Sequence, residues 1–390
     1  MITVEEALAR VFELAHPMPP ETVPLADAAG RVLLKPVHAR RDQPPFAASA
    51  MDGYAVRYED ARPGATLTVI GESAAGSRFG GTLNPGQAVR IFTGAPVPAG
   101  AARVVIQEDV ARDGDTITIG DRLDRSDHIR PVGGDFRAGA EMSAPRRLRA
   151  VDVALLAAMN VPEVAVARRP VVALLATGDE LVMPGEDPSP DQIIASNSFG
   201  LKAMCESAGA EARLLPVARD TEASLRTGFE LAEGADLIVT IGGASVGDRD
   251  LVAPVAESLG MQRAFYKIAM RPGKPLMAGR LAGSAMLGLP GNPVSSMVCG
   301  TIFVLPLIRA MLGLGARPAS RSTARLAAGL AANGPREHYM RARLGPDGLT
   351  AFDRQDSSLL SVLGEADVLV VRPANDGPRS AGEMADYIPL

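Results

Sequence analysis

Two stretches decide the fold: VVALLATGDE at residues 171–180 and DLIVTIGGASVG at residues 236–247. Each begins with a run that is apolar at nearly every position and then enters a turn that contains glycine. Strands of this kind are buried on both faces, as the strands of parallel sheets are. Helices are expected between the two runs, over about 198–208 and 222–233, with another strand over 212–217. Strands that alternate with helices predict an α/β domain whose parallel-rich sheet is covered on both faces.

The chain that precedes this α/β region has a different texture. Thr3 and Glu6 have the spacing of a capping box and predict an N-terminal helix. Residues 44–136 are crowded with turn signals between short β-rich runs, which predicts a small, mostly β module. Residues 137–169 return to helix. They could pack back onto residues 1–43, and the β module would then be an insertion.

The chain that follows begins with a long apolar run, residues 294–314. This run is near the length that spans a bilayer. Because Gly300, Pro306 and Arg309 interrupt it, a buried core helix is expected instead of a membrane span. Residues 316–390 read as short strands and predict a terminal β domain.

Length and composition exclude several classes of protein. The chain has 390 residues, which is too many for one ordinary core. Its net charge of -5 argues against a general nucleic-acid binder. Two cysteines exclude a disulfide scaffold and a zinc site built from three or four thiolates, and four histidines argue against a histidine-rich metal centre. The N-terminus lacks the basic and apolar regions of a targeting segment, so a cytoplasmic enzyme or binding protein is the expectation.

Ligands of α/β sheets bind at the loops beyond the carboxyl ends of the strands. The loop after residue 241 offers Gly242, Gly243, Ser245 and Gly247, and such glycines let a backbone approach an anion closely. The loop matches neither the dinucleotide fingerprint nor the phosphate-binding P-loop. A plain tight turn is therefore the alternative interpretation, and Ser245 would then only cap that turn.

Three carboxylates, Glu180, Asp220 and Asp250, follow three different strands or loops of the same region. Carboxylates that converge in this way suit a hard cation such as Mg²⁺, which tolerates bound phosphates. The alternative for Asp220 and Asp250 is helix N-capping, which each could perform alone.

Basic residues and a proline-rich loop complete the region. Lys267, Arg271 and Lys274 lie on a turn stiffened by Pro272 and suit an oxyanion; a solvated basic loop is the alternative. The second loop opens the long apolar helix, with Asn292 at the cap and Pro293 in the first turn, and it could be purely structural. Its residues are Pro290, Gly291, Asn292 and Pro293.

In the β module, the loops around Asp52 and Thr93 read as ordinary turns. The four histidines are scattered, and neither a Ser/His/Asp nor a Cys/His arrangement emerges. Composition alone therefore gives no reason to place chemistry in this module.

Together these motifs resemble the molybdopterin molybdenumtransferase family, called MoeA in bacteria and similar to the E domain of gephyrin-like proteins. The segments that carry the resemblance run from end to end of the chain: residues 49–55, 91–98, 133–136, 176–181, 242–250, 267–275, 289–296 and 336–344.

The resemblance implies four domains and a homodimer. They are an elongated discontinuous domain (1–43 and 137–169), an inserted β domain (44–136), a molybdopterin-binding α/β domain (170–315) and a C-terminal β-barrel-like domain (316–390). The implied active site lies between the α/β domain of one subunit and the inserted domain of the other.

The implied reaction starts from adenylylated molybdopterin and molybdate, uses Mg²⁺, and releases AMP. The dithiolene sulfurs of the pterin then hold molybdenum, which agrees with a protein poor in thiolates. Carried over residue by residue, the matching positions are Asp52, Thr93, Asp135, Glu180, Asp220, Asp250, Lys267, Arg271, Lys274, Pro290 and Pro293. Glu180, Asp220 and Asp250 would handle metal and phosphate, the three basic residues would bind molybdate or phosphates, and Asp52 and Thr93 would come from the partner subunit.

This chain departs from the family pattern at four positions. Ala47, Ala48 and Ala102 replace polar or acidic residues that are usual there, and Arg271 replaces a common lysine, keeping its charge but changing its geometry. The alanines weaken any role for those carboxylates and leave Asp52 as the acid of its loop.

Three other functions stay open. One is the adenylyltransferase that activates molybdopterin, which shares the α/β domain, and another is a non-catalytic gephyrin-like scaffold. The third is use of tungstate in place of molybdate. The adenylyltransferase and the apoproteins of molybdenum enzymes are conceivable protein partners.

Overall fold

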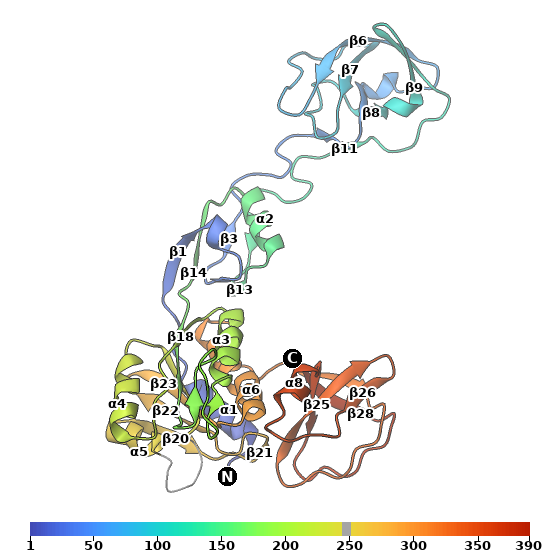
Figure 1. Cartoon of the computed structure of the whole chain (residues 1–390). Helices are drawn as coiled ribbons and strands as arrows, with labels where there is room; N and C mark the ends of the chain where they lie inside the picture. The colour runs from blue at the N-terminus through green and yellow to red at the C-terminus, as the bar shows by residue number, and fades with distance from the viewer. Residues whose placement is uncertain (244–250) are drawn as a thin grey trace.

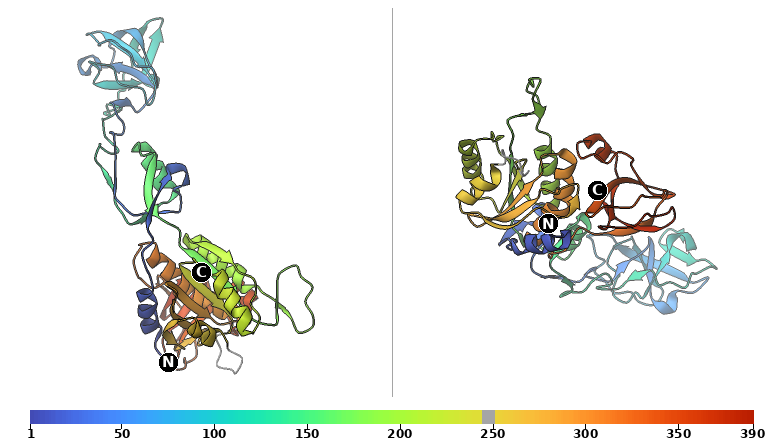
Figure 2. Two further views of the ribbon diagram at one scale, coloured as in Figure 1. Left: turned by 90° about the vertical axis from the view of Figure 1, so that its left-hand side faces the viewer. Right: turned by 90° about the horizontal axis from the view of Figure 1, so that it is seen from below.

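The computed structural model describes residues 1–243 and 251–390. The molecule is long and bent (Figure 1). An α/β domain and a terminal β domain lie side by side at one end, a slender stalk rises from them, and a small β domain sits at the far tip (Figures 1 and 2). The protein is thus a mixed α/β multidomain chain, as the sequence predicts.

The α/β domain is built on a sheet whose strand order among the described residues is β18-β15-β19-β23-β22-β20. The first four strands are parallel, and β22 runs antiparallel to both of its neighbours. The strands are β15 Val171–Ala176, β18 Glu211–Leu214, β19 Leu237–Ile241, β20 Gln262–Tyr266, β22 Met277–Leu281 and β23 Ser284–Leu289. Strand β18 ends earlier than the predicted 212–217 because Pro216 has no N–H to continue the ladder.

Alternate side chains of β15 enter two different cores. Val172 and Leu174 belong to the larger core, whereas Ala173 and Leu175 belong to the smaller one on the opposite face. Helices α1, α3, α6 and α7 supply the first core, and α4 and α5 the second. Burial on both faces is the physical reason for a strand that is apolar throughout. These helices are α1 Val4–Glu13, α3 Asn197–Ala208, α4 Glu222–Leu231, α5 Val252–Ser258, α6 Pro293–Cys299 and α7 Leu305–Met311.

Helix α1 begins at the predicted capping box. Thr3 accepts a hydrogen bond from the backbone N–H of Glu6, whose carboxylate accepts one from the backbone of Thr3. The helix buries Val4, Ala7 and Val11 against the larger core. It therefore packs on the α/β domain, beside β20 and α7.

The long apolar run, 293–311, is the one described helix with the length and composition of a membrane span, and 78% of its apolar window is buried inside the protein. It is a core helix, as predicted. A π-helical turn, Gly300–Val304, joins α6 to α7. Pro306 lies just beyond this turn and cannot donate a backbone hydrogen bond, which accounts for the local change of helical pitch.

The stalk consists of chain segments from both sides of the β module. Its sheet has the order β1-β14-β2-β13, so strands from residues 20–33 pair with strands from residues 146–167. The predicted strand-like stretch 31–39 is two short strands, because Pro36 breaks the ladder between them. The elements are β1 Pro20–Pro24, β2 Val32–Leu33, β3 Val37–His38, β12 Glu141–Met142, β13 Arg146–Arg147, α2 Ala150–Ala158 and β14 Glu163–Ala167, with a 3-10 turn at Leu25–Asp27.

The distal β domain is entered and left through this stalk. Its main sheet has the order β8-β5-β7-β6-β10-β9. Its strands are β4 Ala48–Ser49, β5 Gly53–Val56, β6 Thr66–Ser73, β7 Gln87–Ile91, β8 Arg103–Ile106, β9 Val110–Asp113, β10 Thr116–Ile119 and β11 Ile129–Arg130, with 3-10 turns at Tyr58–Asp60 and Gln107–Asp109.

The terminal β domain shares one sheet with the α/β domain, because β21 pairs with β25. The sheet order is β21-β25-β27-β28-β24, and β26 pairs with β25. The predicted strand 323–330 ends at Arg325, where the chain begins to bend away. The elements are β21 Met270–Arg271, β24 Ser322–Arg325, β25 Glu337–Gly345, β26 Gly348–Ala351, α8 Leu360–Gly364, β27 Val368–Arg372 and β28 Met384–Pro389.

Candidate functional site

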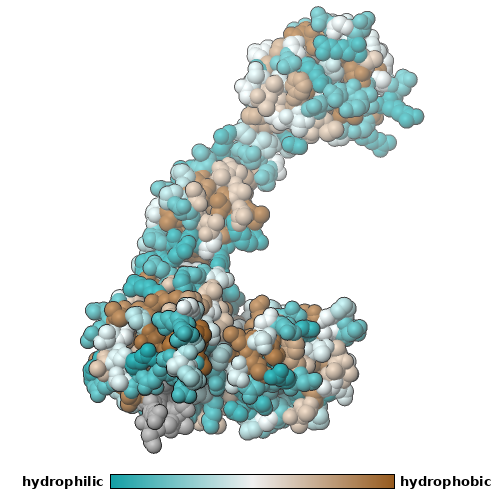
Figure 3. Space-filling view, in the orientation of Figure 1, coloured by the Kyte–Doolittle hydropathy of each residue, from teal (hydrophilic) through white to brown (hydrophobic). Residues whose placement is uncertain are grey.

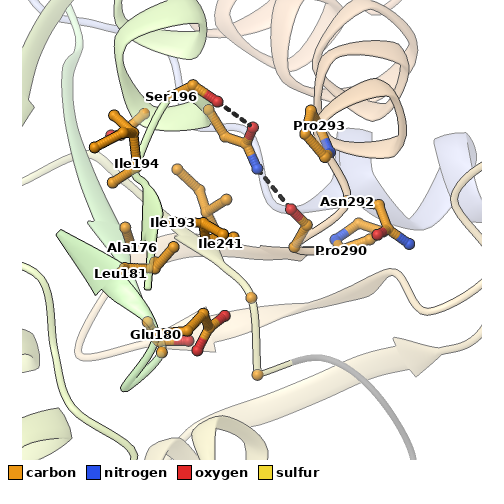
Figure 4. A pocket seen from close by; sticks show the side chains of 18 of the residues that line it. Ala176, Glu180, Leu181, Ile193, Ile194, Ser196, Ile241, Pro290, Asn292 and Pro293 are labelled. Carbon is orange, nitrogen blue, oxygen red and sulfur yellow. Dashed lines mark hydrogen bonds between the residues drawn. The ribbon is translucent and has the colours of Figure 1, made fainter. Parts of the chain in front are cut away.

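A cavity of about 670 Å³ opens at the carboxyl ends of the parallel strands of the α/β domain. Loops that follow β15, β18, β19 and β23 line it, together with the N-terminus of α3 and Ser358 of the terminal domain. The cavity therefore lies where ligands of open α/β sheets bind. Of the predicted residues it gathers Glu180, Asp220, Gly242, Gly243, Pro290, Gly291, Asn292 and Pro293 (Figure 4 shows part of this set).

The carboxylates of Glu180 and Asp220 come from two neighbouring loops that are tied together. The backbone N–H of Asp220 donates to the carboxylate of Asp179 at 3.1 Å. Arg219 donates to the carbonyl of Asp179 at 2.8 Å. The loop after β15 and the loop after β18 thus hold each other in place. Helix α4 is capped by Thr221, so Asp220 is not its N-cap and the capping interpretation of Asp220 is wrong.

Gly178 shapes the position of Glu180. Its φ of +151° is unusual for residues with a side chain, and a Cβ there would lie 2.5 Å from one Glu180 carboxylate oxygen. Glycine at this position therefore leaves the space that the Glu180 carboxylate occupies.

The backbone geometry of the loop after β19 also requires glycine. Gly242 and Gly243 have φ values of +97° and +59°, where glycine is favoured. A Cβ on Gly242 would lie 2.6 Å from the carbonyl oxygen of Thr177, and one on Gly243 would lie 2.3 Å from Val252. Three predicted residues of this loop and its neighbourhood, Ser245, Gly247 and Asp250, lie outside the described residues.

The proline-rich loop is fixed from the side of α3. The side-chain amide of Asn197 donates to the carbonyl of Gly291 at 2.7 Å, and the Ser296 hydroxyl donates to the carbonyl of Pro290 (the first is drawn in Figure 4). Asn292 is the N-cap of α6, as predicted, but its side chain makes no capping hydrogen bond. The Asn292 side chain instead lines the cavity.

The described donors suit a hard cation only in part. Among residues 1–243 and 251–390 there is no group of three or more His, Cys, Asp or Glu side chains placed to hold a metal ion. Glu180 and Asp220 nevertheless line the same cavity. Mg²⁺ is commonly held by one or two carboxylates together with substrate phosphates and water, and two oxygen-bearing side chains fit that pattern.

The three predicted basic residues lie at the same edge of the sheet but outside the lining of the cavity. Strand β20 runs parallel to β23 across the intervening β22, so Lys267 at the end of β20 reaches this edge. The Lys267 ammonium lies 5.1 Å from the centre of the Tyr266 ring. Arg271 is exposed at the end of β21 and Lys274 is exposed on the turn that follows, and Pro275 is the part of that turn that lines the cavity.

A buried basic cluster beside Arg271 was not predicted from the sequence. Arg271 in β21 pairs with His338 in β25. Arg341 is fully buried, and its Nε and Nη1 have no hydrogen-bond partner among the described residues. Burial, together with Arg271 and Arg341, lowers the pKa of His338 to about 4. Unpaired buried cationic N–H groups are costly unless an anion reaches them.

Asp52 and Thr93 lie together in the distal β domain, far from this cavity within one chain (Figure 1). The Asp52 carboxylate accepts hydrogen bonds from the backbone and the hydroxyl of Thr93, which lower its pKa together with the charge of Arg90. Gly53 is not the turn residue that the sequence indicates. It begins β5, and a Cβ there would lie 2.0 Å from the carbonyl oxygen of Val105.

Asp135 is exposed in the neck, the segment between β11 of the distal domain and β12 of the stalk. Its backbone N–H donates to the carbonyl of Gln43 at 2.9 Å. One chain therefore brings the α/β residues together but holds Asp52, Thr93 and Asp135 apart from them.

Some lining residues escaped the sequence analysis. Thr177 is 4% exposed, lines the cavity, and has a side-chain oxygen without a partner among the described residues. Asn197, Ser358, Ile193 and Ile194 also line it. Thr177 is the first polar residue after a strand that is apolar throughout, and this position could have marked it as a residue of the ligand site. Ser358 comes from another domain, and its neighbours in the sequence gave no such indication.

Known protein families match this chain along most of its length. Three family models match consecutive parts of the chain: the MoeA N-terminal region (domain I and II) at residues 2–160, a probable molybdopterin binding domain at 173–310, and the MoeA C-terminal region (domain IV) at 323–390.

Individual relatives agree with these models. The molybdopterin molybdenumtransferase of Nostoc sp. is 37% identical, over 93% of this chain and 87% of its own. That of Haemophilus influenzae is 38% identical, over 80% of this chain and 78% of its own. A crystal structure titled as the molybdopterin biosynthesis MoeA protein of Pyrococcus horikoshii superposes with a TM-score of 0.83 at 31% identity, and covers 100% of this chain and 99% of that one. From its sequence and its fold, this chain belongs to the MoeA family.

Proposed function

We propose that this protein inserts molybdenum from molybdate into adenylylated molybdopterin and releases AMP. Membership of the family gives the chain a role in molybdenum cofactor biosynthesis as a transferase. Beyond that role, we propose the identity of the substrate, of the nucleotide that is released and of the metal ion.

The observation that carries the proposal is the composition of the cavity. One region of its lining offers two carboxylates, Glu180 and Asp220, and the Gly242–Gly243 turn. A substrate with a pyrophosphate link needs both a cation held by carboxylates and close backbone approach to its oxygens. Bound there, Mg²⁺ would neutralise charge that develops on the phosphate oxygens.

The residues of the chain then have separate roles. Glu180 and Asp220 would hold the cation, and Gly242 and Gly243 would let the backbone come close to the pyrophosphate. Water attacks one phosphorus of the pyrophosphate and breaks its bond to the bridging oxygen, so that AMP leaves and the pterin keeps its own phosphate. The dithiolene sulfurs of the pterin receive molybdenum, so the protein supplies no thiolate.

Arg271, Lys267 and Lys274 would attract molybdate at the edge of the sheet. The buried Arg341 near Arg271 supports this role, because its Nε and Nη1, which have no partner in the described part of the chain, suit a tetrahedral oxyanion. Arg341 belongs to β25 of the terminal domain, which would thereby take part in the reaction.

Asp52 and Thr93 would complete the site from a second copy of the chain in a homodimer, because within one chain they lie in the distal domain. Asp135 at the neck would belong to the same contribution. Ser245, Gly247 and Asp250 keep their proposed roles in phosphate and metal binding. We expect the protein to act in the cytoplasm.

The test is an assay with purified protein, adenylylated molybdopterin, MgCl₂ and molybdate, in which AMP is measured by chromatography. Glu180→Ala and Asp250→Ala should abolish molybdate-dependent AMP release, and Glu180→Asp should retain part of it. Glu233→Ala, an exposed carboxylate after α4, is the matched control. No AMP release by the wild type would refute the function, and full activity of both site variants would refute the assignment of residues.

The same assay separates the other candidates. An adenylyltransferase would consume ATP and add the nucleotide to molybdopterin. A non-catalytic scaffold would do neither. Tungstate added in place of molybdate tests the choice of oxyanion.

A further inference from the structure

The cavity has an apolar wall that the proposed chemistry does not use. After Glu180 the chain leaves the domain as a narrow arm, made of β16 Leu181–Val182 and β17 Ile193–Ile194 with residues 183–192 between them (the long loop in Figure 2). Ile193 and Ile194 both line the cavity.

These two isoleucines are unusually exposed for β-branched apolar residues. The exposed fraction is 58% for Ile193 and 39% for Ile194, although both border a cavity whose deeper wall includes the buried Ile241. Apolar residues that stay exposed at the mouth of a cavity commonly mark a surface that a ligand or partner covers.

Across the cavity stand two rigid rings. Pro290 and Pro293 belong to the loop that opens α6, and Figure 4 shows them on the side opposite Ile194. An isoleucine wall that faces proline rings offers two apolar surfaces to a flat ligand. Such surfaces recognise the face of an aromatic ring and leave its hydrogen-bonding edge free.

The apolar wall has a fixed spacing from the carboxylates. The backbone N–H of Ile193 donates to the carbonyl of Glu180 at 2.8 Å, and that of Ala195 donates to the carbonyl of Val182 at 2.8 Å. The wall therefore cannot slide along the arm without breaking these bonds. A ligand that stacks on it would present its phosphate groups at a set distance from Glu180.

We propose that Ile193 and Ile194 form a wall on which a planar heteroaromatic ring of the substrate stacks, and that this wall sets the affinity for that ring. The inference rests on the proposed function, since it assigns one wall of that site to one part of its substrate. The substrate has two such rings, the pterin and the adenine.

The test compares three variants with the wild type. Ile193→Ala/Ile194→Ala removes the wall, and Ile193→Val/Ile194→Val keeps most of its apolar surface. Leu231→Ala removes a side chain that is 49% exposed on α4 and does not line the cavity. The KM for adenylylated molybdopterin should rise roughly 10-fold or more in the double alanine variant, with a smaller change in kcat. The valine variant and Leu231→Ala should stay near the wild type.

Two competitive inhibitors identify the ring. AMP carries the adenine, and neopterin carries a pterin without the nucleotide. The inhibitor whose ring stacks on the wall should bind roughly 10-fold more weakly to the double alanine variant, while the other should be unaffected.

An unchanged KM in the double alanine variant would overturn the inference while leaving the proposed function intact. Loss of dimer mass in that variant with an unchanged KM would also overturn it, because the isoleucines would then serve contact between subunits. If the wild type releases no AMP, the proposed function fails by itself. Calorimetric titration of AMP and neopterin then tests the isoleucine wall. Weaker binding of either compound to the double alanine variant than to the wild type supports the wall. Equal binding to both proteins, or no binding to the wild type, refutes it.

Discussion

The carboxylate of Asp52 accepts two hydrogen bonds from Thr93, one from its backbone N–H at 2.7 Å and one from its hydroxyl at 2.8 Å. Forty-one positions separate the two residues in the chain. Two donors that favour the charged form lower the pKa of Asp52, so its carboxylate stays ionised in mildly acidic solution.

Replacing Thr93 by valine should raise the pKa of Asp52 toward its ordinary value, because the hydroxyl donor is lost and the backbone donor remains. Thr93→Ser keeps both donors and should leave the pKa low. Carboxyl-carbon NMR titration of protein labelled at aspartate measures the effect. Identical titration of Asp52 in the wild type and in Thr93→Val would contradict it.

A shared site predicts complementation between two inactive chains. Asp52→Asn damages the distal contribution, and Glu180→Ala damages the α/β contribution. Mixed dimers of the two should regain activity, because one of their two sites then combines an intact distal domain with an intact α/β domain. Random mixing should give up to about a quarter of the wild-type rate. AMP release after co-expression with two affinity tags measures it, and an inactive mixed dimer would count against the shared site.

Gly178→Ala should raise the Mg²⁺ concentration needed for half-maximal AMP release. A Cβ at this position would lie 2.5 Å from a Glu180 carboxylate oxygen, so the carboxylate must move. The positive φ adds a backbone cost of about 1–3 kcal/mol, as for other sparsely populated backbone conformations. Gly234→Ala also has a positive φ, of +77°, but no atom lies within 4 Å of its Cβ, so it should keep the wild-type Mg²⁺ requirement. Equal Mg²⁺ curves for all three proteins would contradict this role of Gly178.

His338 should make the protein sensitive to acid between pH 6.5 and about 4. Burial and the neighbouring arginines lower its pKa to about 4 in the folded protein, while the unfolded chain binds the proton near its ordinary pKa of 6.5. The unfolded state therefore gains a proton first as pH falls, and the folded state loses up to about 3 kcal/mol over this window.

In His338→Gln the midpoint temperature of unfolding should change less with pH over this range, because glutamine does not titrate. The exposed His38→Gln is the control and should keep the wild-type slope. Scanning calorimetry at half-unit steps of pH gives both slopes. The same slope in all three proteins would mean that the folded protein does not lower the pKa of His338.

The two cysteines should not react with Ellman's reagent until the protein unfolds. Cys205 and Cys299 are 0% exposed. Burial raises the pKa of the Cys205 thiol to about 12 and that of Cys299 further, so little thiolate is present at pH 8. Ser207→Cys adds an exposed thiol two positions from Cys205 and should react at once. Rapid modification of the wild type in buffer would contradict the burial of both thiols.

Local patterns predicted much of the fold because their causes are local. The capping box at Thr3 and the apolar run of β15 can be read from a few neighbouring residues. Strand ends were harder, because β18 stops before Pro216 while its apolar pattern continues. Asn292 was placed correctly at the start of α6, yet its capping bond is absent.

The site divides in the same way. Glycines at positions 242 and 243 are visible in the sequence as a motif, and their φ values give the physical reason for them. The burial of Arg341 could not be predicted, because Arg341 lies in β25 opposite Leu369 of β27, a pairing between strands far apart in the chain. The exposure of Ile193 was equally hidden, because it depends on an arm that projects from the domain and on no pattern in the neighbouring residues.

The neck of the distal domain has an evolutionary consequence. Residues Gln43 and Phe136 pair where the chain enters and leaves, and Asp42 accepts a hydrogen bond from the backbone of Ala138 at 2.7 Å. An insertion whose two ends meet can be lengthened, exchanged or deleted in a single genetic event without cutting the sheet beneath it. Selection could therefore alter the distal half of the molecule while the cavity at the other end stayed unchanged.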